Sequence, residues 1–263
     1  MNWEVLMERI PLEAVTIVTG GGRGIGRSIA LRMGKETAVI LVGRTETDLA
    51  STASEIEAGG GWASYHVGDV ADPRTAEATV SMARELNLPV RHLICNAGIG
   101  KGGETHTFDR NVWKRLFDVN VHGSFFFTQA VIPHMVDARS GTICYISSTA
   151  GLHGSKRNAA YAASKAALNN LAESVALEYG KFGITSVALC PGFVDSEMTD
   201  RVVSGLMGHR GIDENEARAV IGRTTAQRRI FAPSEVAETV AYVCSGKARS
   251  ISGAPLVLSG GEV

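Results

Sequence analysis

The stretch Val15-Thr-Ile-Val-Thr-Gly-Gly-Gly-Arg-Gly-Ile-Gly26 decides the fold of this chain. Its first five residues are apolar or β-branched, which predicts a strand buried on both faces. The glycines after it permit a tight turn, and the helix expected next offers free N–H groups to a phosphate. A purely structural turn is an equal alternative at this point, because Arg27 stands where the strict G-x-G-x-x-G pattern from Gly22 needs its third glycine.

The same alternation of short apolar runs and longer amphipathic stretches continues along the chain. It predicts an α/β fold: a single doubly wound Rossmann domain over residues 1–263, with a seven-stranded parallel sheet and helices on both faces. We expect strands at residues 15–19, 38–42, 92–95, 141–146, 185–190 and 255–258, with a weaker one at 62–67, and helices at residues 26–33, 46–57, 73–86, 111–136, 159–182 and 233–245.

Residues from about 195 to 231 break this alternation with a mixture of apolar side chains, glycines and charges. The segment follows a strand end, where open α/β sheets place their ligands, so we predict a mobile substrate lid. A surface excursion without function is the alternative. The arginines of the segment either meet the phosphates of coenzyme A or a phosphopantetheine arm or are simply solvated: Arg201, Arg210, Arg223, Arg228 and Arg229.

Composition excludes several classes of protein. The 263 residues carry 26 basic and 27 acidic side chains, so no basic surface argues for nucleic acid. Residues 1–9 make a poor signal peptide, and no apolar run approaches the roughly 20 residues of a membrane span. We expect a cytoplasmic protein without membrane contact. Its seven histidines show no metal-ligand spacing, and its four cysteines, without any C-x-x-C pair, are expected to be buried reduced thiols: Cys95, Cys144, Cys190 and Cys244.

The pentapeptide Tyr161-Ala-Ala-Ser-Lys165 supplies the chemistry. Positions i and i+4 of a helix share one face, so the phenol and the ammonium are expected to point the same way. An ammonium about 4 Å from a phenolate interacts by about 4 kcal/mol at an effective dielectric of about 20. That interaction predicts a Tyr161 pKa lowered from about 10 toward neutrality, suited to proton transfer on a carbonyl. Alone, the Y-x-x-x-K pattern often arises by chance.

The end of the second strand indicates the cofactor. An NAD-selective site would place an acid there for the ribose 2′-hydroxyl, but Val42 is followed by Gly43 and Arg44. Arg44 and Arg23 of the glycine loop together suit a 2′-phosphate, since guanidinium groups bind phosphate bidentately. We therefore predict NADP(H) rather than NAD(H). A solvated surface arginine is the alternative for Arg44.

Taken together, these elements resemble the short-chain dehydrogenase/reductase family from about residue 12 to 261. The resemblance rests on seven motifs in family order: the glycine loop Thr19–Gly26, Asp69-Val70, Asn96-Ala97-Gly98, Asn120 within Asp118-Val-Asn-Val, Ser148, Tyr161 with Lys165, and Pro191-Gly192. Neighbouring residues of a strand point to opposite faces, so only one of Ser147 and Ser148 faces the substrate, and the family spacing to the tyrosine selects Ser148. The segments at 191–199 and 252–261 are similar to those of 3-oxoacyl-carrier-protein, acetoacetyl and polyketide ketoreductases.

The resemblance implies a role for each matched position. It implies that Ser148 donates a hydrogen bond to the substrate oxygen and that Tyr161 protonates it. Lys165 would hold the nicotinamide ribose and keep the tyrosine acidic, and Asn120 would anchor a water. The implied catalytic residues are Asn120, Ser148, Tyr161 and Lys165; the implied cofactor-binding residues are Gly20, Gly22, Arg23, Gly24, Ile25, Gly26, Arg44, Asp69, Val70, Asn96, Ala97, Gly98, Tyr161, Lys165, Pro191, Gly192, Val194 and Ser196.

These residues predict a metal-free, NADP(H)-dependent oxidoreductase that transfers hydride between nicotinamide and a ketone or secondary alcohol. The expected substrate is a small-molecule or acyl-thioester carbonyl, in particular a 3-oxoacyl thioester. An NAD-dependent secondary alcohol or hydroxyacyl dehydrogenase is the alternative, and a non-enzymatic dinucleotide sensor or an inactive partner subunit is a remote one. Family membership further implies a homotetramer or dimer.

Overall fold

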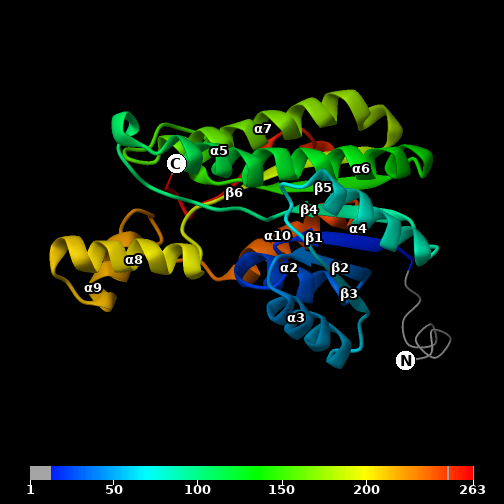
Figure 1. The fold of residues 1–263 in the computed structure, drawn as a ribbon, viewed down its shortest axis with the longest axis horizontal. Coiled ribbons are helices and arrows are strands. Elements are labelled where there is room, and N and C mark those ends of the chain that lie inside the picture. The colour runs from blue at the N-terminus through cyan, green and yellow to red at the C-terminus, as the bar shows by residue number, and fades with distance from the viewer. Residues whose placement is uncertain (1–12, 248, 263) are drawn as a thin grey trace.

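The described residues form one sheet of seven parallel strands, as predicted, and the order of the strands is β3-β2-β1-β4-β5-β6-β7 (Figure 1). The computed structural model describes residues 13–247 and 249–262, so residues 1–9, considered above as a signal peptide, lie outside the described part. The strands are β1 (Val15–Thr19), β2 (Ala38–Gly43), β3 (Ala63–Val67), β4 (Val90–Cys95), β5 (Gly141–Ile146), β6 (Ile184–Pro191) and β7 (Pro255–Leu258).

Helices cover both faces because successive strand residues point to opposite sides of the sheet. On one face, Ile17 and Ile40 lie in a core with Phe127 and Leu168. On the other, Val18 and Leu41 pack with residues such as Ile29. The first face carries α4 (Pro73–Glu85), α6 (Gly123–Asp137) and α7 (Ala159–Tyr179), and the second carries α2 (Gly24–Met33), α3 (Glu46–Ala58) and α10 (Pro233–Cys244).

The helix expected over residues 111–136 is divided. The chain forms α5 (Arg110–Phe117), then a single π-helical turn at Asp118–His122, and then α6. The turn contains Asn120, whose fully buried side chain bonds to the backbone of Ile99. A wide turn inside a helix re-aims one side chain, and π-turns are often found at functional sites. The helix is divided where Asn120 bonds to Ile99, a residue outside the helix, so hydrophobic periodicity alone does not predict the division.

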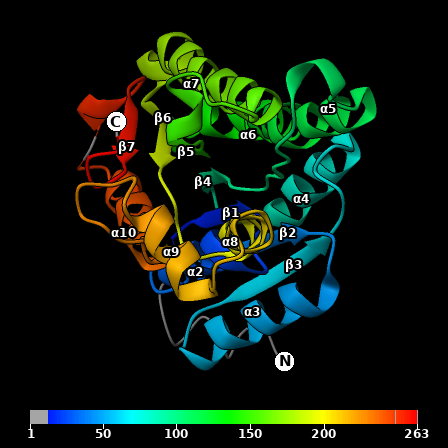
Figure 2. The same ribbon diagram turned by 90° about the vertical axis from the view of Figure 1, so that its left-hand side faces the viewer.

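Residues 195–231 are mostly helical. They form α8 (Glu197–Arg210) and α9 (Glu214–Gly222), which lie beyond the edge of the main body of the fold in Figure 1 and in front of the sheet in Figure 2. The two helices have an apolar contact of their own, centred on Val203, Ala217 and Ile221. Arg218 of α9 links the two helices, because its guanidinium pairs with Asp200 of α8 as well as with Asp195 and Glu214.

Three further findings concern features considered in the sequence. All four cysteines are free and buried, as predicted. Within residues 13–247 and 249–262, no helix is both long and apolar enough to cross a membrane. The same residues bring together no group of three or more side chains that suits a metal ion.

The buried His92 on β4 makes stability depend on pH. Burial, assisted by the neighbouring charge of Arg91, lowers the pKa of His92 to about 4, and its Nδ1 has no hydrogen-bond partner among the described residues. In the unfolded chain His92 is protonated below about pH 6.5, whereas in the folded chain it stays neutral until the pH approaches about 4. The destabilising contribution of His92 is therefore absent at pH 7 and grows as the pH falls from about 6.5 to about 4.

We predict that acidification from pH 7 to pH 4 removes about 3 kcal/mol of folding free energy through His92 alone. Urea unfolding across this range measures the loss, and His92→Gln, which has no titrating group, should flatten the pH dependence by about that amount. A variant with the wild-type slope would contradict the assignment.

Candidate active site

A cavity of about 900 Å³ opens at the carboxyl ends of the strands. The segments that follow β1, β2, β4, β5 and β6 all reach it, as parallel sheets with central crossovers dictate. Every cofactor-binding residue predicted from the sequence lines this cavity, together with Ser148, Tyr161 and Lys165. Asn120 is the one predicted site residue that is missing from the described residues lining the cavity.

The glycine loop is held tightly against the end of β4. The amide of Asn96 donates to the carbonyls of Thr19 (3.0 Å) and Gly20 (3.1 Å), and the Thr19 hydroxyl accepts from two backbone N–H groups. A β-carbon on Gly26 would lie 2.1 Å from the Gly20 carbonyl oxygen, so only glycine fits there. The close approach fixes the start of α2 beneath the cavity.

The start of α2 tests whether a dinucleotide fits. Its N-cap residue Arg23 makes no side-chain capping bond to the helix, and Gly24, Ile25 and Gly26 of the first turn line the cavity. Uncapped N–H groups at a helix start attract an anion through hydrogen bonds and the helix dipole. The residues present therefore suit a pyrophosphate.

Charged groups mark the far end of the cavity, near β2 and β3. Burial raises the pKa of Asp69, but hydrogen bonds from the Ala71 N–H and the Arg115 guanidinium outweigh it and hold that pKa below its ordinary value. The exposed Arg44 also lowers it, yet Arg44 itself enters no ion pair within the described residues. One cationic group is thus left available at the end of β2.

Arg23 has a different partner. Its guanidinium lies 2.9 Å from the Glu197 carboxylate at the start of α8. Both side chains are more than half exposed, so the pair contributes little to stability. The pair does, however, join the glycine loop to the segment predicted as a lid, across the mouth of the cavity. Arg23 and Arg44 both line the cavity, Arg23 is paired with Glu197, and the convergence of the two arginines on a 2′-phosphate stays a prediction.

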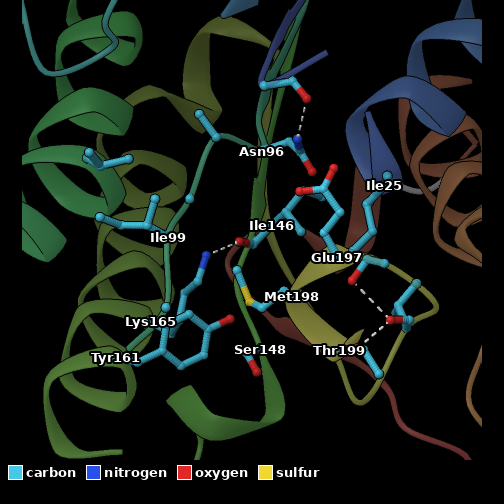
Figure 3. Close-up of a pocket in the computed structure, with 18 of the residues that line it drawn as sticks. Ile25, Asn96, Ile99, Ile146, Ser148, Tyr161, Lys165, Glu197, Met198 and Thr199 are labelled. Atoms are coloured by element: carbon cyan, nitrogen blue, oxygen red, sulfur yellow. Dashed lines mark hydrogen bonds between the residues drawn. The ribbon is translucent and has the colours of Figure 1, made fainter. Parts of the chain in front are cut away.

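Lys165 is anchored beneath Tyr161. Its Nζ donates to the Ile146 carbonyl oxygen at 2.7 Å and lies 5.6 Å from the centre of the Tyr161 ring. Figure 3 shows the amine directed at Ile146, with Tyr161, Ser148 and Met198 in the same part of the cavity. The Ser147 hydroxyl is buried and donates to the Lys165 carbonyl, whereas Ser148 is half-buried and lines the cavity.

The predicted lowering of the Tyr161 pKa is wrong. Burial raises the pKa of Tyr161 to about 12, and the interaction with the Ser148 side chain offsets only part of this effect. The ammonium is held by the Ile146 carbonyl and lies over the ring, so it does not stabilise the phenolate oxygen directly. Burial also acts on the lysine, since it lowers the pKa of Lys165 to about 8.

Asn120 lies behind the cavity wall. Its amide nitrogen donates to the Ile99 carbonyl (3.0 Å) and the Ser164 hydroxyl (2.9 Å), and its oxygen accepts from the Ile99 N–H (2.8 Å). The side chain therefore ties the loop after β4 to α7. This geometry is structural, and the predicted water-anchoring role stays a prediction.

Sequence reasoning missed several lining residues. Met198 comes from α8, and a β-carbon on Gly100 would lie 3.5 Å from both its sulfur and the Tyr161 ring. Glu262 and His153 also line the cavity. Of the lid arginines, Arg201 reaches the lining, whereas Arg229 pairs with Glu235. In the sequence, Glu262 is distinguished only by the two glycines before it. No local motif connects that position to the cavity.

Comparisons with known proteins agree with this geometry. Residues 14–206 match the family described as short chain dehydrogenase. The chain is 31% identical to a 3beta-hydroxysteroid dehydrogenase of Mediterraneibacter gnavus (95% of this chain, 94% of that protein) and 34% identical to a putative ketoacyl reductase of Streptomyces coelicolor (94% and 96%). A crystal structure of a single-site variant of actinorhodin polyketide ketoreductase with NADPH superposes with a TM-score of 0.91 at 33% identity, covering 95% of this chain and 97% of that one.

The tight glycine contact generates a prediction. Gly26→Ala places a methyl group against the Gly20 carbonyl and should destabilise the fold by about 2 kcal/mol through overpacking. It should also weaken dinucleotide binding, because the loop must move. Gly208→Ala is the matched control: nothing lies within 4 Å of its added carbon, and it should stabilise α8 by up to about 1 kcal/mol. Thermal unfolding and cofactor titration of both variants provide the measurement, and equal effects would refute the steric argument.

Proposed function

Because the chain belongs to the short-chain dehydrogenase family, whose members are NAD(P)-dependent oxidoreductases acting on CH–OH groups, we propose that it is an NADP(H)-dependent ketone reductase with a 3-oxoacyl thioester-type substrate. One observation carries the proposal: Ser148, Tyr161 and Lys165 line the same cavity as the uncapped start of α2. The similarity to a ketoacyl reductase and a polyketide ketoreductase supports the substrate class.

The residues divide the chemistry as follows. A bound nicotinamide supplies hydride to the carbonyl carbon. Ser148 and Tyr161 hold the carbonyl oxygen, and their fixed hydroxyls stabilise the negative charge that develops on it. Tyr161, protonated near neutral pH because its pKa is about 12, then gives its proton to that oxygen. Lys165, with a pKa of about 8, exchanges protons with solvent in the working pH range and renews the supply. Asn120 positions the loop over this set.

A protonated tyrosine can act as the proton donor of a carbonyl reduction. Reduction needs a proton donor at the substrate oxygen, whereas oxidation needs a base there. Burial that raises the pKa of Tyr161 keeps the phenol in its donor form. This protonation state is consistent with the proposed ketone reduction, and the same residues can catalyse the reverse oxidation.

The cofactor preference rests on the end of β2. Arg44 is exposed at the cavity without an ion-pair partner among the described residues, while the nearby Asp69 is held by Arg115. A 2′-phosphate bonded by Arg44 would gain a charge-assisted hydrogen bond that a ribose hydroxyl cannot match. The remaining lining residues named above would hold the pyrophosphate, the adenine and the nicotinamide.

We predict that Arg44→Ala weakens NADPH binding at least about tenfold and leaves NADH binding unchanged. Arg110→Ala, which removes an exposed charge that does not line the cavity, is the control and should change neither affinity. Fluorescence titration with both cofactors gives the answer. Equal losses for NADPH and NADH in Arg44→Ala would argue against the 2′-phosphate contact.

A second candidate is an NAD-dependent secondary alcohol dehydrogenase. The similarity to a 3beta-hydroxysteroid dehydrogenase favours it, as do the apolar lining residues Ile99, Phe193 and Met198, which suit an alicyclic substrate. A non-enzymatic sensor or inactive partner subunit is disfavoured, because the serine, tyrosine and lysine all meet at one cavity.

A substrate panel with variants tests the catalytic assignment. Tyr161→Phe should lower kcat about 1000-fold through loss of the proton donor, and Ser148→Ala should lower it about 100-fold. Tyr242→Phe, at an exposed tyrosine on α10, is the control and should keep full activity. NADPH absorbance with 3-oxoacyl thioesters and cyclic ketones gives the rates. Wild-type activity in Tyr161→Phe would overturn the mechanism.

The surroundings of the site support further proposals. Large apolar side chains are exposed on α5, α6 and α7 at Trp113, Phe125 and Leu177, which suits a homotetramer or dimer. Four free buried thiols fit the reducing cytoplasm. We further propose that the whole chain is a single domain in which residues 195–231 act as the substrate lid. In this segment Met198 lies beside Tyr161, and Glu197 bonds to Arg23.

A further inference from the structure

Glu262, near the end of the described residues, brings a carboxylate to the wall of the cavity. Gly260 and Gly261 have φ values of +56° and +90°, which side chains other than glycine rarely adopt. The turn they make is held by a hydrogen bond from the Gln227 N–H to the Gly260 carbonyl (3.3 Å). The buried Ser259 hydroxyl accepts from the Glu262 N–H (3.2 Å), which fixes the backbone of Glu262.

The Glu262 side chain contacts the loop that carries the proposed catalytic serine. Thr149, the residue after Ser148, donates from its hydroxyl to Glu262 Oε2 (3.4 Å). On the other side, the same oxygen lies against Gly192, where an added β-carbon would approach it to 2.5 Å. Glu262 is half-buried and lines the cavity with these neighbours. The carboxylate therefore forms part of the wall between the serine loop and the turn after β6.

Glu262 places a carboxylate at this wall. Burial raises the pKa of Glu262 above its ordinary value, and the Thr149 hydrogen bond and the interaction with His153 offset only part of this effect. Lys101, Lys156, Arg157 and Arg201 also line the cavity, but all four are exposed to solvent, where water and salt screen their charges. The buried Lys165 amine is bonded to the Ile146 carbonyl. The half-buried Glu262 carboxylate is screened less than these exposed charges, so it acts more strongly on a substrate group bound against Thr149 and Gly192.

We propose that Glu262 determines substrate specificity by selecting ketones that carry a hydrogen-bond donor, such as an amide N–H or a hydroxyl, and by rejecting those that carry a carboxylate at that position. The inference rests on the proposed ketone reductase activity, since it places the substrate carbonyl between Ser148 and Tyr161. A donor group satisfies the carboxylate oxygen, whereas a second carboxylate is repelled.

A matched pair of small ketones tests the proposal. Acetoacetamide and acetoacetate differ in one terminal group, an amide donor in the first and a carboxylate in the second. The wild-type protein should favour acetoacetamide in kcat/KM with NADPH. Glu262→Gln should shift the ratio toward acetoacetate by about tenfold. Glu57→Gln removes the same charge from an exposed site on α3 and should leave the ratio unchanged.

Binding separates this inference from the proposed activity. Calorimetric titration of both compounds into the protein with NADP⁺ should show the same preference in the wild type and its loss in Glu262→Gln. An unchanged ratio in Glu262→Gln, or no preference in the wild type, would overturn the role of Glu262 even where ketones are reduced. No reduction of any ketone, with the binding preference present and dependent on Glu262, would instead contradict the proposed activity alone.

Discussion

The hydrogen bond from Lys165 Nζ to the Ile146 carbonyl is the contact on which the site depends. It joins α7 to the end of β5 and buries an ammonium group at the base of the cavity. A charge is costly to bury unless it is hydrogen-bonded, so the carbonyl fixes where the amine lies. The same contact places Tyr161 one helical turn away and brings its phenol to the side of the cavity that Ser148 shares.

Burial sets the protonation states of both partners in opposite senses. It raises the pKa of Tyr161 to about 12 and lowers that of Lys165 to about 8, because a poorly hydrated environment disfavours either charged form. The result is a phenol that holds its proton until the substrate oxygen needs it, beside an amine that titrates near the working pH. This arrangement suits proton delivery to a carbonyl under reduction.

The sequence predicts the sheet well because its strands are apolar runs buried on both faces; residues 15–19, 141–146 and 255–258 agree with the structure at both ends. It predicts the cavity lining because the motifs follow strand ends. What it could not predict depends on contacts between distant segments. The π-turn at Asn120 depends on hydrogen bonds to Ile99, and α8 and α9 pack on each other. A glycine turn positions Glu262, and the Lys165 amine bonds to the Ile146 carbonyl.

The central claim is that burial, and not proximity to a phenolate, controls this pair. The most direct test is the pKa of Lys165, measured by NMR on protein with ¹³C-labelled lysine side chains and assigned through the signal missing in Lys165→Met. If burial controls the pair, Lys165 titrates near pH 8, well below the ordinary lysine pKa of 10.5. A Lys165 signal that titrates at or above the ordinary value would contradict it.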